Sequence, residues 1–149
     1  NKLRAAFKDC SLTTDVMVGF HEETEQDFEE SLAFVKRISF EKVHVFPYSE
    51  RTGTAASKRG DSVSKQEKDR RASVMIAETE KIRQSYLKSQ IGKEVQLLVE
   101  GRANSEYLRG YTKNYLPVLL KSTQDLTGCE TDCIIRSVKN DECIANLDF

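Results

Sequence analysis

Two polar turns near the start of the 149-residue chain carry groups able to bind a small ligand. Gly19 has no side chain, so a ligand or another backbone segment can approach it closely, and Glu23 follows within reach of the same turn. Arg51 follows the second turn and could bind a carboxylate or a phosphate. The first turn would be explained equally well as an ordinary strand-to-helix turn capped by Thr24.

Two aromatic residues precede the second turn. Phe46 and Tyr48 are two positions apart in an apolar segment, so in a strand both would point to the same side. Their rings could lie beside an adenine, although packing in a hydrophobic core is the commoner use of such residues. His44 alternates with Val43 and Val45, which is typical of a hydrogen-bonded core histidine, and we assign no residue a catalytic role.

A third group of candidate residues lies in the last third of the chain. Basic and tyrosine side chains are interleaved there, which suits phosphate contact combined with base stacking. Residues 90–149 carry seven basic and nine acidic side chains, so RNA binding would have to use one basic face. A hydrophobic core with solvated charges is the alternative. The candidate RNA-binding residues are Arg102, Arg109, Lys113 and Tyr115.

Composition limits the remaining possibilities. The formal net charge is −1, and the four cysteines form no CxxC pair or zinc-type grouping, so we expect reduced thiols that pack as small apolar residues and no metal site. Between residues 51 and 71 seven basic residues outnumber three acidic ones, which predicts either a basic patch or a solvated helix entry. No apolar run approaches the length of a membrane span, so we expect no membrane contact and a cytoplasmic location.

The elements that position the first two groups form a βαβ unit. Residues 14–20 and 42–49 are β-branched, apolar runs and predict strands. Between them, Thr24 and Asp27 are spaced as a capping box, and Phe28, Leu32, Val35 and Ile38 form one apolar helix face. The two strands should be parallel, and the ligand crevice of such a sheet lies beyond the carboxyl ends of its strands.

The rest of the chain predicts a helix and a barrel. A helix should begin after Ser64 and run to about Lys88, with an apolar stripe that includes Ala72, Met75 and Ile76. Five short strands then follow at residues 95–99, 107–111, 115–120, 133–138 and 143–147, which predicts a small five-stranded antiparallel β-barrel. The fold class is therefore α/β followed by a β-barrel, with domains at residues 1–90 and 91–149.

Five segments, in the same order and spacing, resemble the radical S-adenosylmethionine tRNA methylthiotransferase family. They are residues 14–20 (TDVMVGF), 23–28 (ETEQDF), 44–56 (HVFPYSERTGTAA), 91–93 (IGK) and 110–115 (GYTKNY). The resemblance covers nearly the whole chain. It implies the C-terminal part of the radical half-barrel, followed by the OB-like, RNA-binding TRAM barrel. The strand that ends at residue 49 is most similar to the branch that acts on N6-threonylcarbamoyladenosine.

The resemblance implies a function for each half of the chain. It implies that Gly19, Glu23, Phe46, Tyr48 and Arg51 face S-adenosylmethionine, while the barrel grips a tRNA anticodon stem-loop rather than DNA. The full enzyme would add a methylthio group to C2 of N6-threonylcarbamoyladenosine 37. The usual Pro-Gly of the first turn is replaced by His21 and Glu22.

The same resemblance identifies what the chain lacks. The family holds two [4Fe-4S] clusters, one of them on a CxxxCxxC loop, and no such loop is present in these residues. Three thiolates are needed to leave one iron site open, so we expect the fragment to be inactive without the missing N-terminal part of the same polypeptide. A stand-alone RNA-binding module without catalysis is the alternative, and an inert scaffold that meets a protein partner is a third possibility.

Overall fold

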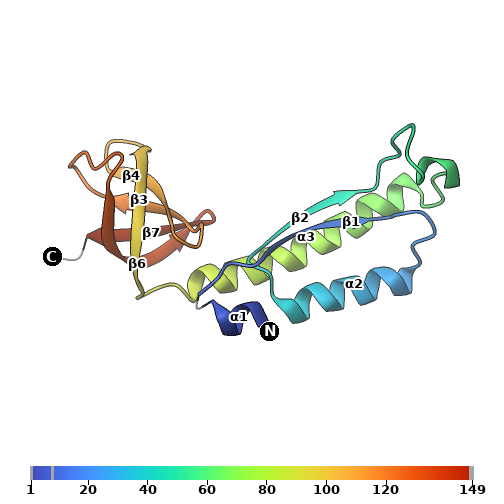
Figure 1. Ribbon diagram of the computed structural model, residues 1–149, viewed down its shortest axis with the longest axis horizontal. Coiled ribbons are helices and arrows are strands. Elements are labelled where there is room, and N and C mark those ends of the chain that lie inside the picture. The colour runs from blue at the N-terminus through green and yellow to red at the C-terminus, as the bar shows by residue number, and fades with distance from the viewer. Residues whose placement is uncertain (1, 8, 148–149) are drawn as a thin grey trace. The chain divides into compact units, whose positions relative to one another are not determined.

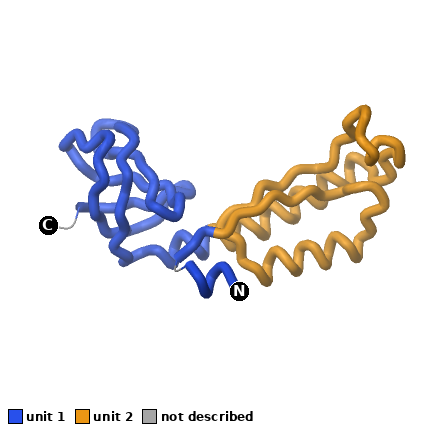
Figure 2. The backbone as a smooth tube through the Cα atoms, in the orientation of Figure 1, with its two compact units in different colours: residues 1–11, 84–149 blue, residues 12–83 orange. Residues whose placement is uncertain are grey.

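The computed structural model of the chain describes residues 2–7 and 9–147. The chain divides into two compact units, which are residues 1–11 with 84–149 (unit 1) and residues 12–83 (unit 2), as Figure 2 shows. No helix within the described ranges has the length and apolar character needed to cross a membrane. The elements in Figure 1 are α1 (Lys2–Ala6), β1 (Thr13–Val18), α2 (Glu25–Ile38), β2 (Lys42–Pro47), η1 (Ser57–Arg59), α3 (Lys65–Lys88), β3 (Glu94–Arg102), β4 (Tyr107–Thr112), β5 (Pro117–Lys121), β6 (Glu130–Lys139) and β7 (Glu142–Leu147).

Unit 2 is built on a two-stranded parallel sheet, which confirms the predicted strand, helix, strand order. Val16 of β1 lies opposite Val45 of β2 in the register. Alternate side chains of both strands point toward α2 and α3, because successive side chains of a strand point to opposite faces. The buried residues of this core are Val18, Phe28, Val35, Ala72 and Met75.

The opposite face of the sheet is open. Met17 and Phe46 are neighbours in the register of β1 and β2, and both side chains are exposed. Parallel sheets are normally covered on both faces, and an isolated pair of strands is marginally stable. Unit 2 therefore presents a sheet face that the described residues leave uncovered, on which Met17 and Phe46 lie beside the exposed Asp15, Lys42 and His44.

Both long helices begin at the residues that the sequence indicates. The Thr24 hydroxyl accepts a hydrogen bond from the Asp27 backbone N–H, and the Asp27 carboxylate accepts one from the Thr24 N–H, which is the predicted capping box. Hydrogen bonds from the hydroxyl and N–H of Thr24 hold the pKa of Asp27 below its usual value. The Ser64 hydroxyl accepts from the Glu67 N–H at 3.2 Å and begins α3 in the same manner.

One part of the predicted stripe on α3 is wrong. Ile76 is exposed, whereas Ala72, Met75 and Thr79 are buried. Ile76 is one residue beyond Met75, which places it about 100° further around the helix and outside the contact with the sheet. The stripe continues instead to Leu87, which is fully buried in unit 1.

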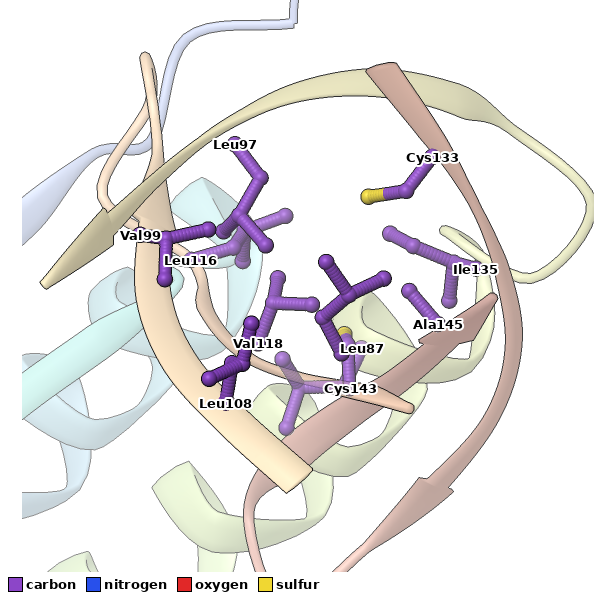
Figure 3. Close-up of a cluster of buried hydrophobic side chains, with 11 residues drawn as sticks. Leu87, Leu97, Val99, Leu108, Leu116, Val118, Cys133, Ile135, Cys143 and Ala145 are labelled. Atoms are coloured by element: carbon purple, nitrogen blue, oxygen red, sulfur yellow. The ribbon is translucent and has the colours of Figure 1, made fainter. Parts of the chain in front are cut away.

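Unit 1 is a closed five-stranded barrel with the strand order β3-β4-β5-β7-β6. The prediction that all pairs are antiparallel is wrong at one seam, because β5 and β7 pair in parallel with Val118 opposite Cys143. Figure 3 shows the inward side chains, which come from every strand together with Leu87 from the last turn of α3. Leu87, Leu97, Leu108 and Ile135 are among the largest of these buried side chains.

The four cysteines have unlike surroundings. All are free thiols, with Cys133 and Cys143 buried in the barrel, Cys10 partly buried and Cys129 exposed. Burial raises the pKa of the Cys133 thiol to about 11, so this side chain is a neutral apolar group at ordinary pH. The expectation that all four pack as small apolar residues is therefore wrong for Cys129.

Candidate functional site

The turn that follows β1 is held by the carboxylate of Glu23. This carboxylate accepts a hydrogen bond from the backbone N–H of Gly19 and another from the guanidinium of Arg71, at 2.8 Å. Arg71 also donates to the backbone carbonyl of Glu23 at 2.9 Å. The structure thus brings Gly19 and Glu23 together, and the Glu23 carboxylate, which the sequence suggests as a ligand-binding group, holds the turn itself.

Arg71 is the buried centre of this arrangement. Its side chain is 6% exposed, and its Nε donates to Glu67 at 2.9 Å. Hydrogen bonds from Arg70, followed by those from Arg71, hold the pKa of Glu67 at about 2. Three carboxylates, those of Glu23, Glu25 and Glu67, therefore meet one guanidinium, which fixes the start of α3 against the turn between β1 and α2.

Gly19 is required where it stands for two reasons. Its φ of 71° lies in the left-handed region that glycine adopts without a steric penalty. A Cβ at this position would also meet the side chain of Lys68, which is buried and forms an ion pair with Asp61. The close approach predicted at this glycine is made by a lysine side chain of α3.

Two buried polar atoms near the strand ends have no hydrogen-bond partner among the residues that the structure describes. They are the hydroxyl of Tyr48 and Nδ1 of His21. Tyr48 packs its ring edge-on against Phe20, with centroids 5.0 Å apart, and the ammonium of Lys68 lies 5.3 Å from the Tyr48 centroid. Because buried polar groups are normally paired, these two atoms are candidates for contact with a ligand, with water or with another part of a larger protein.

The other two expected cofactor residues lie in different surroundings. Phe46 is on the open face of the sheet, beside Met17, whereas Tyr48 is buried although the two are only two positions apart. Arg51 is exposed in the loop after β2, where its backbone carbonyl accepts from the Thr54 N–H and hydroxyl. The turn after β1 and the neighbouring Tyr48 are therefore held in place by internal contacts, whereas Arg51 is a surface residue.

The basic residues between 51 and 71 are largely neutralised by neighbouring carboxylates. Lys65 pairs with Asp69, Lys68 with Asp61, and Arg70 with both Glu25 and Glu67. Together with Arg71, four of the seven basic side chains have acidic partners within unit 2. An ion-paired helix entry, in which Lys68 and Arg71 are buried, describes this segment better than a basic patch.

On the barrel, two of the four expected RNA-binding residues have intramolecular partners. The guanidinium of Arg102 donates to the backbone carbonyl of Gln124 at 3.1 Å, so it holds a loop in place. Arg109 forms an ion pair with Glu142 at 3.2 Å across strands. Each of these arginines must share or give up a contact before it binds phosphate.

The other two expected RNA-binding residues, Lys113 and Tyr115, line a groove of about 490 Å³ on the outer face of the barrel. Lys113 and Tyr115 come from the turn between β4 and β5, and both are exposed. Tyr111 joins them at the end of β4, with its ring centroid 6.4 Å from that of Tyr115. The structure therefore brings together Lys113, Tyr111 and Tyr115 from the interleaved basic and tyrosine residues of the sequence.

Sequence reasoning missed several groups that shape these sites. Lys68 and Arg71 were grouped with surface charge, but both are buried, and only the three-dimensional packing of α3 on the turn reveals this. Glu100 and Glu130 line the same groove as Tyr115 and were assigned no role. Their positions on different strands become neighbours only through the register of the barrel.

No family model matches the chain. Among curated proteins, a threonylcarbamoyladenosine tRNA methylthiotransferase of Bacillus subtilis is 39% identical over 133 residues, which is 86% of this chain and 29% of that protein. One from Thermotoga maritima is 37% identical over 78% of this chain and 27% of its own length. A tRNA-2-methylthio-N(6)-dimethylallyladenosine synthase of Geobacillus thermodenitrificans is 36% identical over 85% of this chain and 25% of its own length. The chain thus spans between a quarter and a third of these relatives.

Among solved structures, the apo form of Mycoplasma genitalium RNase R matches at a TM-score of 0.36 with 12% sequence identity. The match covers 66% of this chain and 20% of that chain. At this level the likeness supports no statement about the fold or function of this chain.

Proposed function

Because this chain is related to tRNA methylthiotransferases along most of its length, we propose that it is the C-terminal part of such an enzyme. In this proposal the whole protein acts in the cytoplasm and adds a methylthio group to C2 of N6-threonylcarbamoyladenosine 37 in tRNA. Unit 2 would be the last portion of the radical S-adenosylmethionine half-barrel, and the barrel of unit 1 would be the TRAM domain. The observation that carries the proposal is the identity of 36 to 39% over most of the chain.

The uncovered sheet face of unit 2 supports the proposal that unit 2 is one portion of a larger half-barrel. β1 pairs only with β2 among the described strands, and Met17 and Phe46 leave apolar surface on the uncovered face. Further parallel strands next to β1 would extend the sheet and enclose that face. In this arrangement Phe46 would point toward the interior of the half-barrel, where a nucleoside ligand could meet it.

The residues at the strand ends fit one wall of an S-adenosylmethionine site. Tyr48 has a buried hydroxyl that lacks a partner among the described residues, and His21 offers a second such atom. Gly19 and Glu23 fix the turn beside them, and exposed Arg51 could approach a carboxylate. When bound, S-adenosylmethionine would supply the radical chemistry and the methyl group, while these residues would hold and orient it.

The donor set of this chain does not fit an iron-sulfur cluster. Among the described residues no three histidine, cysteine or acidic side chains are grouped as metal ligands. Cys129 is exposed while Cys133 is buried with a raised pKa, so the two do not act as a thiolate pair. Both [4Fe-4S] clusters would be held by the remaining part of the polypeptide, and we assign no chemical step to this chain.

The barrel would supply the grip on tRNA. Lys113 and Tyr115 lie together at one end of β4, and Arg109 and Arg102 lie on strands of the same barrel. The charges of unit 1 do not favour binding through overall attraction, so contact through one face is required. An RNA-binding module without catalysis would use the same face of the barrel. That alternative, however, does not explain why one face of the sheet in unit 2 is uncovered.

Titration of the chain with a labelled anticodon stem-loop at several salt concentrations tests the RNA-binding part. We expect the affinity to fall steadily as salt rises, because each phosphate contact releases counterions. Replacing Lys113 with alanine should reduce the slope of log affinity against log salt by about 1. Lys121→Ala is the matched control, since Lys121 is exposed at the end of β5 and does not line the groove. Absence of binding even at low salt would contradict the proposed grip.

A further inference from the structure

We propose that the groove beside Tyr115 binds one unpaired RNA base whose hydrogen-bonding edge carries an amino group, with cytosine as the simplest example. The inference deepens the proposed function, since it rests on the barrel being an RNA-binding domain. The volume of about 490 Å³ lies within the range of small-ligand sites and accommodates a single nucleoside. Its lining combines aromatic, aliphatic, amide, hydroxyl and carboxylate groups of β3, β4 and β6 with Lys113 and Tyr115 from the turn between β4 and β5.

The strand register builds the floor of the groove. Leu98 of β3 lies opposite Tyr111 of β4 on one side and opposite Glu130 of β6 on the other. Side chains directly opposite each other on one face of a sheet have Cβ atoms about 5 Å apart, so the three form a row. Leu98 is 46% exposed on the outside of the barrel, and it gives this row an apolar centre on which a base can rest.

The wall above this floor is an exposed tyrosine held by a strained turn. Tyr115 has a φ of 62° and an exposed fraction of 81%. Two backbone hydrogen bonds fix the turn. The Tyr115 N–H donates to the Thr112 carbonyl at 2.9 Å, and the Thr112 N–H donates to the Leu116 carbonyl at 3.1 Å. A bulky residue seldom adopts this conformation, and strain of this kind concentrates at functional sites.

The ring of Tyr115 is accessible to solvent although it forms an aromatic pair with the ring of Tyr111. Their centroids are 6.4 Å apart and their planes are inclined by 49°, so the two rings are tilted and not stacked on each other. Stacking of unpaired bases on exposed aromatic side chains is the common mode of single-stranded RNA recognition. Because Tyr115 is 81% exposed, its ring can receive a base while the contact with Tyr111 is kept.

The charges in the groove select the edge of the base. Glu100 lies at a β-bulge, where the register of β3 with β4 shifts between Val99 and Gly101. Bulges re-aim side chains next to binding sites, and here Glu100 lines the groove together with Glu130. Two carboxylates outnumber the single ammonium of Lys113, so the groove itself is a poor site for a phosphate, and a phosphate that pairs with Lys113 would lie outside the groove. The carboxylates favour a donor such as the N4 amino group of cytosine.

The test is to compare the binding of fluorescently labelled hexacytidylate and hexauridylate to the chain by anisotropy. We expect cytidylate to bind at least about fivefold more tightly, since uracil has no amino group for the carboxylates. Glu130→Gln should remove most of this difference. Tyr115→Gly should weaken cytidylate binding about tenfold, which is the scale of losing one stacked base.

Controls separate binding from folding. Glycine favours the φ of 62°, so Tyr115→Gly should keep or raise the thermal midpoint of the chain while it lowers affinity. Tyr115→Phe should retain binding because the ring remains, and Lys121→Ala should change the ratio of the two affinities by less than about twofold.

Equal binding of the two oligonucleotides, or unchanged cytidylate binding by a folded Tyr115→Gly variant, would overturn the inference. If the chain still bound the anticodon stem-loop in that case, the proposed function would stand and only the groove would be rejected. If neither oligonucleotide nor stem-loop bound, the RNA-binding proposal itself would fail. If cytidylate binding depended on the groove but the chain failed to support methylthio transfer when joined to the remaining part of a related enzyme, the groove would stand and the enzyme proposal would fail.

Discussion

Replacing Gly110 with alanine is expected to lower the free energy of unfolding of the barrel by about 3 kcal/mol or more, which is the range of severe overpacking. Gly110 lies in β4 opposite Val99, and a Cβ there would collide with the backbone carbonyl of Leu98. Because the obstacle is backbone of the neighbouring strand, a rotamer change cannot relieve it. The barrel would have to separate β3 from β4 to accept the methyl group.

Gly101→Ala is the matched control for this prediction. Gly101 is in β3 of the same barrel, but an added Cβ would find open space and its φ is not positive. We expect a change within about 0.5 kcal/mol, as at ordinary surface positions. Urea unfolding followed by circular dichroism measures both variants, and equal stabilities would contradict the packing described for β3 and β4.

The second large effect is expected in unit 2, where replacement of Arg71 with leucine should lower the free energy of unfolding by about 3 kcal/mol. The guanidinium is 6% exposed and meets Glu23 and Glu67 at 2.8 and 2.9 Å. Removing one partner of a buried ion pair leaves the other charge desolvated and unpaired, which is the main source of the cost. The turn between β1 and α2 would also lose its attachment to α3.

Arg70→Leu is the control for Arg71→Leu because it removes the same chemical group one residue earlier. Arg70 also pairs with Glu25 and Glu67, but its side chain is 44% exposed. Surface ion pairs contribute between about 0 and 1 kcal/mol, so its loss should be small. Urea unfolding monitored by the helical signal at 222 nm compares the two, and a loss at Arg70 as large as that at Arg71 would contradict the buried role of Arg71.

Local sequence patterns predicted most elements of the fold. Thr24 and Asp27 form the capping box because that motif depends only on residues three positions apart. The five barrel strands were recognised from alternating apolar residues bounded by turns, although several begin or end a few residues from the expected positions. Such features depend on near neighbours in the chain, which a sequence displays directly.

Pairings between distant residues could not be predicted in the same way. The parallel seam of β5 and β7 depends on how the barrel closes, and five strands of the same composition are compatible with several closures. Ile76 fits the helical spacing of an apolar stripe, but the orientation of α3 on the sheet leaves it exposed. Both differences come from tertiary packing.

In the candidate sites, too, contacts between residues near in sequence could be predicted and contacts between distant residues could not. Gly19 and Glu23 are only four positions apart, and they meet within one turn. Arg71 reaches Glu23 from 48 positions away, so its partner was not visible in the sequence and its charge was counted as surface charge. On the barrel, Tyr111, Lys113 and Tyr115 are near neighbours and lie together. The contribution of Glu130 to their groove arises only because β6 pairs with β3.

If this chain is a working part of a tRNA methylthiotransferase, it should function in place of the matching segment of a relative. A chimera in which this chain replaces the matching 29% of the Bacillus subtilis threonylcarbamoyladenosine tRNA methylthiotransferase provides the measurement. The chimera would be produced in cells that lack that enzyme, and their tRNA nucleosides analysed by mass spectrometry. We predict that 2-methylthio-N6-threonylcarbamoyladenosine reappears, and that the same host protein without the replacement segment forms none. A chimera that accumulates normally and binds its clusters, but leaves the nucleoside unmodified, would contradict the proposed role of this chain in the enzyme.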